Sequence, residues 1–177
     1  AHLRSQEAAR VQSAAALLQA QRPALGLDAQ HEFHVLRAET DDLGLTHTRF
    51  QQRYQGVKVL GGEFITHMEA TGAFQPHTQA HVAGIRINVT PGLEAAEALA
   101  VAHRDLAPKG DYTVAPTVEL VILPERELVQ VPKGPRRLDQ EVEPTFTERT
   151  IRHTLAYHVH TELENGAEET AHTDYLI

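Results

Sequence analysis

The sequence contains no cysteine and no tryptophan, and it has only two serines. Without cysteine the chain can form no disulfide scaffold, no cysteine nucleophile and no zinc site built on thiolates. No apolar run approaches the ~18 residues that a membrane-spanning helix needs, so we expect no membrane partner. Acidic residues outnumber basic ones by 24 to 16, which argues against nucleic acid as a partner.

The 177 residues are enough for one large domain or two small ones. Charge is distributed unevenly, because residues 1–89 carry eight acidic and eight basic side chains whereas residues 90–177 carry sixteen and eight. Twelve histidines are many for this length, and unperturbed imidazoles titrate near pH ~6.5. We therefore expect an unusually large change of charge between neutral and mildly acidic pH. The chain starts without methionine, and we expect it to be a processed or cut segment.

The first half of the sequence predicts a helix followed by a meander of strands. Residues 6–21 are rich in alanine and follow a helical pattern that ends before Pro23. From residue 32 to about 79, strand-like runs alternate with turn signals, including a tight turn at Gly56. We assign residues 1–84 to an N-terminal domain.

The second half predicts another helix and another antiparallel sheet. Thr90 and Pro91 are suited to open the helix as its cap and first residue. Strand patterns follow, and the turn signals between them include Asn165-Gly166; these strands cover residues 117–123, 151–164 and 169–177. We assign residues 85–177 to a second domain with a long surface excursion at 124–150. The predicted fold class is α+β, with two small lobes that each pack a helix on an antiparallel sheet in a cystatin-like arrangement.

No segment has the pattern of a catalytic site. The run His31-Glu32-Phe33-His34 contains the residue types of a zinc protease motif but separates the histidines by three positions instead of four. His158 and His160 share one face of a strand and could chelate a metal, although a solvated strand face is the commoner explanation. There is no Gly-x-Ser-x-Gly elbow. We therefore predict no catalytic residues and no metal site, and we expect that the chain is not an enzyme.

One segment carries a distinctive motif. It reads His-x-Arg, then an aromatic residue, Gln-x-Tyr, Gly-Val-x-Val and Gly-Gly, and it continues into an apolar strand. The residues concerned are His47, Arg49, Phe50, Gln52, Tyr54, Gly56, Val57, Val59, Gly61 and Gly62. This motif resembles the core of the propeptide domain of thermolysin-like and fungalysin-like secreted zinc metalloproteases. Residues from about 85 onward also resemble the second, companion domain of those propeptides.

The resemblance implies a pro-region that acts as intramolecular chaperone and inhibitor of a protease catalytic domain. That catalytic domain is the implied partner, and it would carry the zinc and calcium of the family, so no cofactor is expected in this chain. Secretion is also implied. Two alternatives remain open: a stand-alone secreted protease inhibitor or binding module of the same fold, and a histidine-rich metal-binding protein.

The motif also has a direct physical interpretation. Phe50 and Tyr54 alternate onto one face of a strand, where the next strand can pack across from them. Gly61-Gly62 can shift the side-chain phase by one residue so that Phe64 returns to the same face. His47 and Arg49 then lie on the opposite face, where they either stabilise the fold or contact the protease.

Overall fold

The computed structural model describes residues 2–131, 145–164 and 170–177. Within these ranges it contains two helices and seven strands. The helices are α1 (His2–Gln21) and α2 (Ala95–Leu106), and the strands are β1 (His31–Thr40), β2 (Thr46–Tyr54), β3 (Val57–Met68), β4 (Phe74–Ala80), β5 (Val114–Gln130), β6 (Phe146–Glu164) and β7 (Thr170–Leu176). Neither of the two helices is long and apolar enough to cross a membrane.

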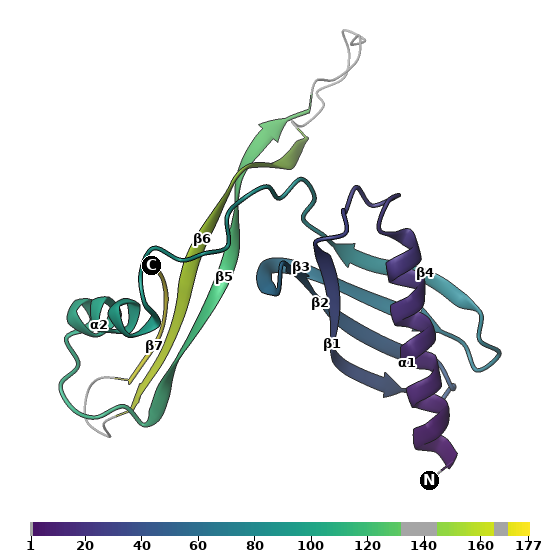
Figure 1. Ribbon diagram of the computed structural model, residues 1–177. Coiled ribbons are helices and arrows are strands. Elements are labelled where there is room, and N and C mark those ends of the chain that lie inside the picture. Colours follow the sequence, from purple (N-terminus) through teal and green to yellow (C-terminus); the bar gives the residue numbers. More distant parts are fainter. Residues whose placement is uncertain (1, 132–144, 165–169) are drawn as a thin grey trace, which may run out of the picture.

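All seven strands belong to one mixed sheet, in the order β1-β2-β3-β5-β6-β7, with β4 also paired to β3 (Figure 1). The predicted fold of two separate helix-on-sheet lobes is therefore wrong. The reason is the length of β3: β4 pairs only with Glu63–Met68, and the start of β3 is left to pair in parallel with β5 through Lys58↔Val121 and Val59↔Ile122. Sequence patterns predict strands but do not show which distant strand occupies a free edge.

Helix α1 covers one face of β1–β3 (Figure 1). Ala14 and Leu18 are buried against Phe33, Phe50 and Phe64. The rings of Phe33 and Phe64 meet edge to face with their centroids 4.9 Å apart, an arrangement that aromatic pairs favour. Small alanine side chains allow the helix to approach these rings closely, which explains the alanine-rich pattern that predicted it.

Helix α2 covers β5 and β6 (Figure 1). It begins at Ala95 and not at Thr90-Pro91 as predicted, because Glu94 and Glu97 form a reciprocal capping box. Its small residues Ala98 and Ala102 are fully buried in a cluster with Tyr157 and Val159.

Residues 82–89, which we call the connecting segment, lead from β4 towards α2 and have no assigned strand of their own. Val82 and Ile85 are buried in a cluster that also contains Val59 from β3 and Ile122 from β5. The region that the sequence marked as a candidate boundary thus packs over the place where β3 meets β5. We call this place, with Lys58, Val59, Val121, Ile122 and the connecting segment, the junction.

The predicted excursion at 124–150 begins and ends as strand, because β5 continues to Gln130 and β6 starts at Phe146. These strand ends form a two-stranded ribbon that extends beyond the rest of the sheet (Figure 1). Cross-strand ion pairs connect them: Arg126 with Glu148 at 3.0 Å, Arg152 with Glu125 at 2.7 Å, and Arg149 with Glu127. Residues 132–144 and the predicted turn at Asn165-Gly166 lie outside the described residues.

Candidate functional site

The motif residues form the β2–β3 hairpin, which turns through Gln55 and Gly56. Both turn residues have positive φ, 48° and 79°. Two consecutive left-handed residues are the requirement of the two-residue turn that matches the twist of paired strands, and glycine adopts this conformation without strain. The predicted turn at Gly56 is confirmed, and it places Tyr54 directly opposite Val57.

A bulge in the hairpin changes which side chains of β3 point into the protein interior. The pairing of β2 with β3 shifts in register between Gln51 and Arg53, and Gly61 adopts a φ of 70°. In a regular strand Val59 and Phe64 would point to opposite faces, because one has an odd and the other an even residue number. As a result of the bulge both are completely buried. The predicted phase shift at Gly61-Gly62 is confirmed.

The side chain of Gln51 occupies the interior of this bulge. Its amide Nε2 lies 2.8 Å from the carbonyl oxygen of Val59, 2.9 Å from that of Gly62 and 3.0 Å from that of Gln52. Carbonyl groups that lose their strand partners at a bulge and are buried need another donor. Gln51 is thus the residue that stabilises the irregular pairing.

Gln52 joins the hairpin to the connecting segment. Its Oε1 accepts a hydrogen bond from the backbone N–H of Val82 at 2.9 Å, and its Nε2 donates to the carbonyl of Val82 at 2.7 Å. The same Nε2 is 2.9 Å from Nδ1 of His31. Gly62 lies against this amide, and a Cβ at position 62 would come within 2.8 Å of Gln52 Oε1. The position of the Gln52 amide therefore leaves room only for glycine at position 62.

His31 is a buried histidine in this network, with 1% of its surface exposed. Burial is the main reason that the pKa of His31 is lowered from its usual value, while Asp28 acts in the opposite direction. The ring also meets Tyr54 edge to face at 5.0 Å between centroids.

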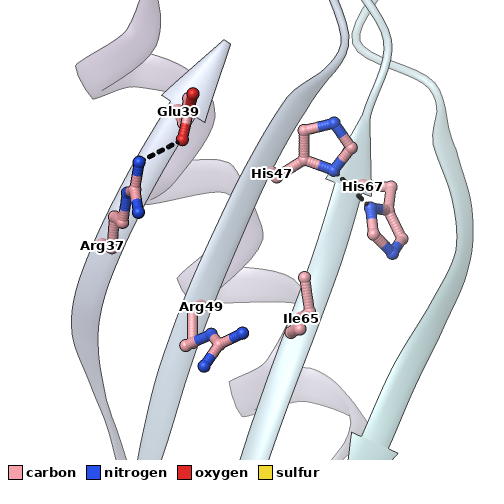
Figure 2. A pocket seen from close by; sticks show the side chains of 6 residues that line it. All are labelled: Arg37, Glu39, His47, Arg49, Ile65 and His67. Atoms are coloured by element: carbon pink, nitrogen blue, oxygen red, sulfur yellow. Dashed lines mark hydrogen bonds and ion pairs between the residues drawn. The ribbon is translucent and has the colours of Figure 1, made fainter. Parts of the chain in front are cut away.

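The opposite side of β1–β3, away from α1, carries a shallow hollow of about 430 Å³ that we call the outer face (Figure 2). Three strands contribute its side chains: Arg37 and Glu39 from β1, His47 and Arg49 from β2, and Ile65 and His67 from β3. The two predicted residues His47 and Arg49 are therefore neighbours in one surface depression.

His47 and His67 lie opposite each other in the register of β2 and β3, and their Nδ1 atoms are 2.8 Å apart. Nε2 of His47 is 3.3 Å from Oδ2 of Asp41. If His47 donates from Nε2 to this carboxylate, its Nδ1 is the acceptor and His67 is the donor of the shared hydrogen bond. The pKa of Asp41 is lowered, chiefly by the backbone N–H of Leu45 and also by His47. A carboxylate that stays ionised thus orients the histidine pair.

The charged groups of the outer face are paired within it. Arg37 lies 2.5 Å from Glu39, and Arg49 lies 3.4 Å from Glu63 at its rim. Half of the Arg49 side chain is exposed, so its guanidinium can exchange Glu63 for a carboxylate of another molecule. Exposed ion pairs of this kind contribute only ~0.2–1 kcal/mol, so such an exchange is energetically easy.

The structure separates the ten predicted motif residues into two groups. Phe50, Gln52, Tyr54, Val59 and Gly62 are buried and Val57 is partly buried, while Gly56 and Gly61 set the turn and the bulge. His47 and Arg49 are accessible on the outer face.

Sequence reasoning missed Gln51 and His31. The signal for Gln51 was two adjacent glutamines in a strand that otherwise alternates, because a second inward-facing polar residue implies a local bulge.

Comparison with known families gives one match: residues 31–75 correspond to the Fungalysin/Thermolysin Propeptide Motif. This range covers β1 to β3 and the beginning of β4, and it contains the hairpin, the bulge and the outer face. The resemblance inferred from the motif is therefore confirmed, and the match supports a propeptide of thermolysin-like or fungalysin-like metalloproteases. Comparison with curated proteins gives no match.

His158 and His160 both contact Oδ1 of Asp174, at 2.8 and 2.9 Å, on the side of β6 and β7 away from α2. This arrangement bridges two strands through one carboxylate. Among the residues that the structure describes, no group of three or more histidine, aspartate or glutamate side chains has an arrangement that could hold a metal ion.

Proposed function

We propose that this chain is the pro-region of a secreted thermolysin-like zinc metalloprotease, which assists folding of the catalytic domain and inhibits it until release. The observation that carries the proposal is the match of residues 31–75 to the propeptide motif. The catalytic domain supplies the zinc chemistry, and the part of this chain is to bind that domain. The division into a first domain at 1–84 and a second at 85–177 belongs to the same proposal.

The arrangement of the motif favours binding through the outer face. The buried glutamines fix the β2–β3 hairpin, so His47 and Arg49 are presented by a rigid sheet. Groups that are already ordered before binding lose little conformational freedom when the partner arrives. We infer that Arg49 exchanges its ion pair with Glu63 for a carboxylate of the catalytic domain.

The test of the function uses the purified chain and the separately produced catalytic domain of its own precursor. We expect the chain to inhibit peptide hydrolysis and to raise the yield of active protease when the denatured catalytic domain is refolded with it. A chain that does neither contradicts the proposal.

The test of the surface compares two exposed arginines that each pair with a glutamate across a strand. We expect Arg49→Ala to weaken inhibition about tenfold or more, because a contact to the partner is lost, while the free energy of unfolding changes by less than ~1 kcal/mol. Arg149→Ala, on the ribbon, removes a similar ion pair and is expected to leave inhibition unchanged. Inhibition constants and urea unfolding of both variants give the answer. Loss of inhibition that only follows loss of stability would show that Arg49 is structural.

A further inference from the structure

The junction connects two large parts of the sheet with few backbone contacts. β3 and β5 share only the pairs Lys58↔Val121 and Val59↔Ile122. Glu119 adds ion pairs to Lys58 at 2.8 Å and Arg53 at 3.8 Å. Further contacts come from the connecting segment, whose Val82 and Ile85 are buried in the apolar cluster shared by β3 and β5. The anchor of this segment is therefore one of the contacts that hold the junction together.

The anchor of Val82 requires His31 to be neutral. Both backbone groups of Val82 bind the amide of Gln52, and a backbone N–H can only donate while a carbonyl can only accept. This fixes the orientation of the amide, so that Gln52 Nε2 points a hydrogen at Nδ1 of His31. A proton on Nδ1 would place two N–H groups against each other, and one of these buried bonds would be lost.

A second histidine lies on the other side of the junction. His153 lies on β6 and is paired with Pro124 of β5. Two residues further along β6, Leu155 packs against the same apolar cluster as Val82 and Ile85. Its Nε2 is buried and has no hydrogen-bond partner among the described residues. Burial lowers the pKa of His153, and the charge of His153 is one of the factors that lower the pKa of His31. Protonation would put a second uncompensated charge in the same region.

The charged groups around His31 mostly oppose its protonation. Arg22, His81 and His153 act against the imidazolium, and Asp28 favours it. The carboxylate of Asp28 is half exposed and lies 3.9 Å from His31 Nε2, too far for a hydrogen bond. Because folding lowers the pKa of His31 and His153, their contribution to stability is complete above the unfolded pKa of ~6.5 and is lost as the pH falls from there through the lower folded values.

Other histidines respond in the opposite direction. Hydrogen bonds to Asp174 and then to Glu162 raise the pKa of His160, which bridges β6 and β7. The contribution of His160 to the β6–β7 pairing is therefore fully present below pH ~6.5, the range in which the junction loses stability. A fall in pH therefore destabilises the junction without destabilising the His160 contacts between β6 and β7.

We propose that the junction is an acid-sensitive latch: protonation of His31 and His153 releases the connecting segment from Gln52 and lets β1–β4 separate from β5–β7, while both parts keep their folds. This property does not depend on the proposed function.

The experiment measures the distance between the two parts. Because the chain has no cysteine, spin labels can be attached through Asp42→Cys in the β1–β2 turn and Arg104→Cys on α2, both exposed positions. We expect a narrow distance distribution by electron–electron double resonance at pH 8 and a broad, longer one at pH 5, with the far-UV circular dichroism unchanged. In the same labelled chain, His31→Asn with His153→Phe is expected to keep the narrow distribution at pH 5, because asparagine retains an acceptor for Gln52 and phenylalanine cannot be charged.

His34→Asn is the matched control, because His34 is on the same strand as His31 but exposed, and it should behave as the original chain does. If the double variant does not fold, His153→Phe alone carries the test, since it leaves the bonds of Gln52 in place. A distance unchanged between pH 8 and pH 5 overturns the proposal. So does equal broadening in the histidine variant, or loss of secondary structure in the same pH range.

Discussion

Position 62 requires glycine because a larger side chain would not fit there, and not because of its backbone conformation. A Cβ at this position would lie 2.8 Å from Oε1 and 3.0 Å from Cβ of Gln52, and 3.2 Å from Cβ of Val59. Real Cβ atoms essentially never come within 3.0 Å of another heavy atom, and Gln52 cannot move without giving up its bonds to Val82. The second glycine of the motif is therefore the counterpart of the buried glutamine.

Gly62→Ala is expected to destabilise the chain by ~1–3 kcal/mol, the usual cost of overpacking a filled interior. At this chain length that corresponds to a fall in melting temperature of roughly 2–12 °C. Gly92→Ala is the control, because a Cβ at position 92 meets nothing within 4 Å. Equal melting temperatures for the two variants, measured by calorimetry, would contradict the close packing described.

The roles of the single residues could be predicted only where the partner is local. The shared strand face of Phe50 and Tyr54 and the turn at Gly56 follow from alternation and turn chemistry, and both were predicted. The bonds of Gln52 to Val82 and His31 link residues 30 and 21 positions away, so no local pattern contains them. Gln52 was predicted as a motif residue, but its bonding partners were found only with the folded chain.

At the scale of elements, β6 and β7 are paired along their backbones and are also linked by one carboxylate that bridges two histidines. The hydrogen bond to His160, then that to His158, lowers the pKa of Asp174, and Asp174 is the main reason for the raised pKa of His160. The contribution of Asp174 is present above its unfolded pKa of ~3.9 and is lost as the pH falls through the lower folded value, whereas that of His160 is lost as the pH rises past ~6.5 through its raised value. The bridge is strongest between these limits.

Asp174→Asn is expected to move the pKa of His160 down towards ~6.5, because the main acceptor of its proton loses its charge. Titration of the His160 ring signals by nuclear magnetic resonance measures this shift directly. Asp42→Asn, at an exposed turn far along the chain, should leave the titration of His160 unchanged. An identical titration curve in Asp174→Asn would show that the carboxylate does not bridge the strands in solution.

The sequence predicted most elements but not their limits or their long-range pairing. Helix α2 begins later than expected because Glu94 and Glu97 cap it, a signal that competed with Thr90-Pro91. The two ends of the predicted 124–150 excursion belong to β5 and β6, and their charged residues form cross-strand ion pairs. From sequence alone a charge-rich segment predicts a loop, because the cross-strand partner of each charge is not visible in the sequence.

At the scale of the whole molecule, the pairing of β3 joins the two predicted lobes into a single sheet. β3 pairs along one edge with β2, and it divides its other edge between β4 and β5. The helix-then-strands order of each half suggested two independent units, because composition and periodicity are local properties. The pairing of Lys58 with Val121 is not local, and it changes the architecture without changing any element.

The divided edge of β3 also has a consequence for the order of folding. Among themselves, strands β1 to β4 pair only with their neighbours in sequence, so each of these pairings closes a short loop. The parallel pairing of β3 with β5 must wait until β4, the connecting segment and α2 have been traversed, and longer loops cost more entropy to close.

We therefore expect the backbone amides of β2 and β3 to become protected before those of Val121 and Ile122 when refolding is followed by pulsed hydrogen exchange. Simultaneous protection of all of them would show that the sheet forms in one step. In a nascent chain, this order means that the meander with the propeptide motif can complete its structure while the residues of β5 to β7 are still being synthesised.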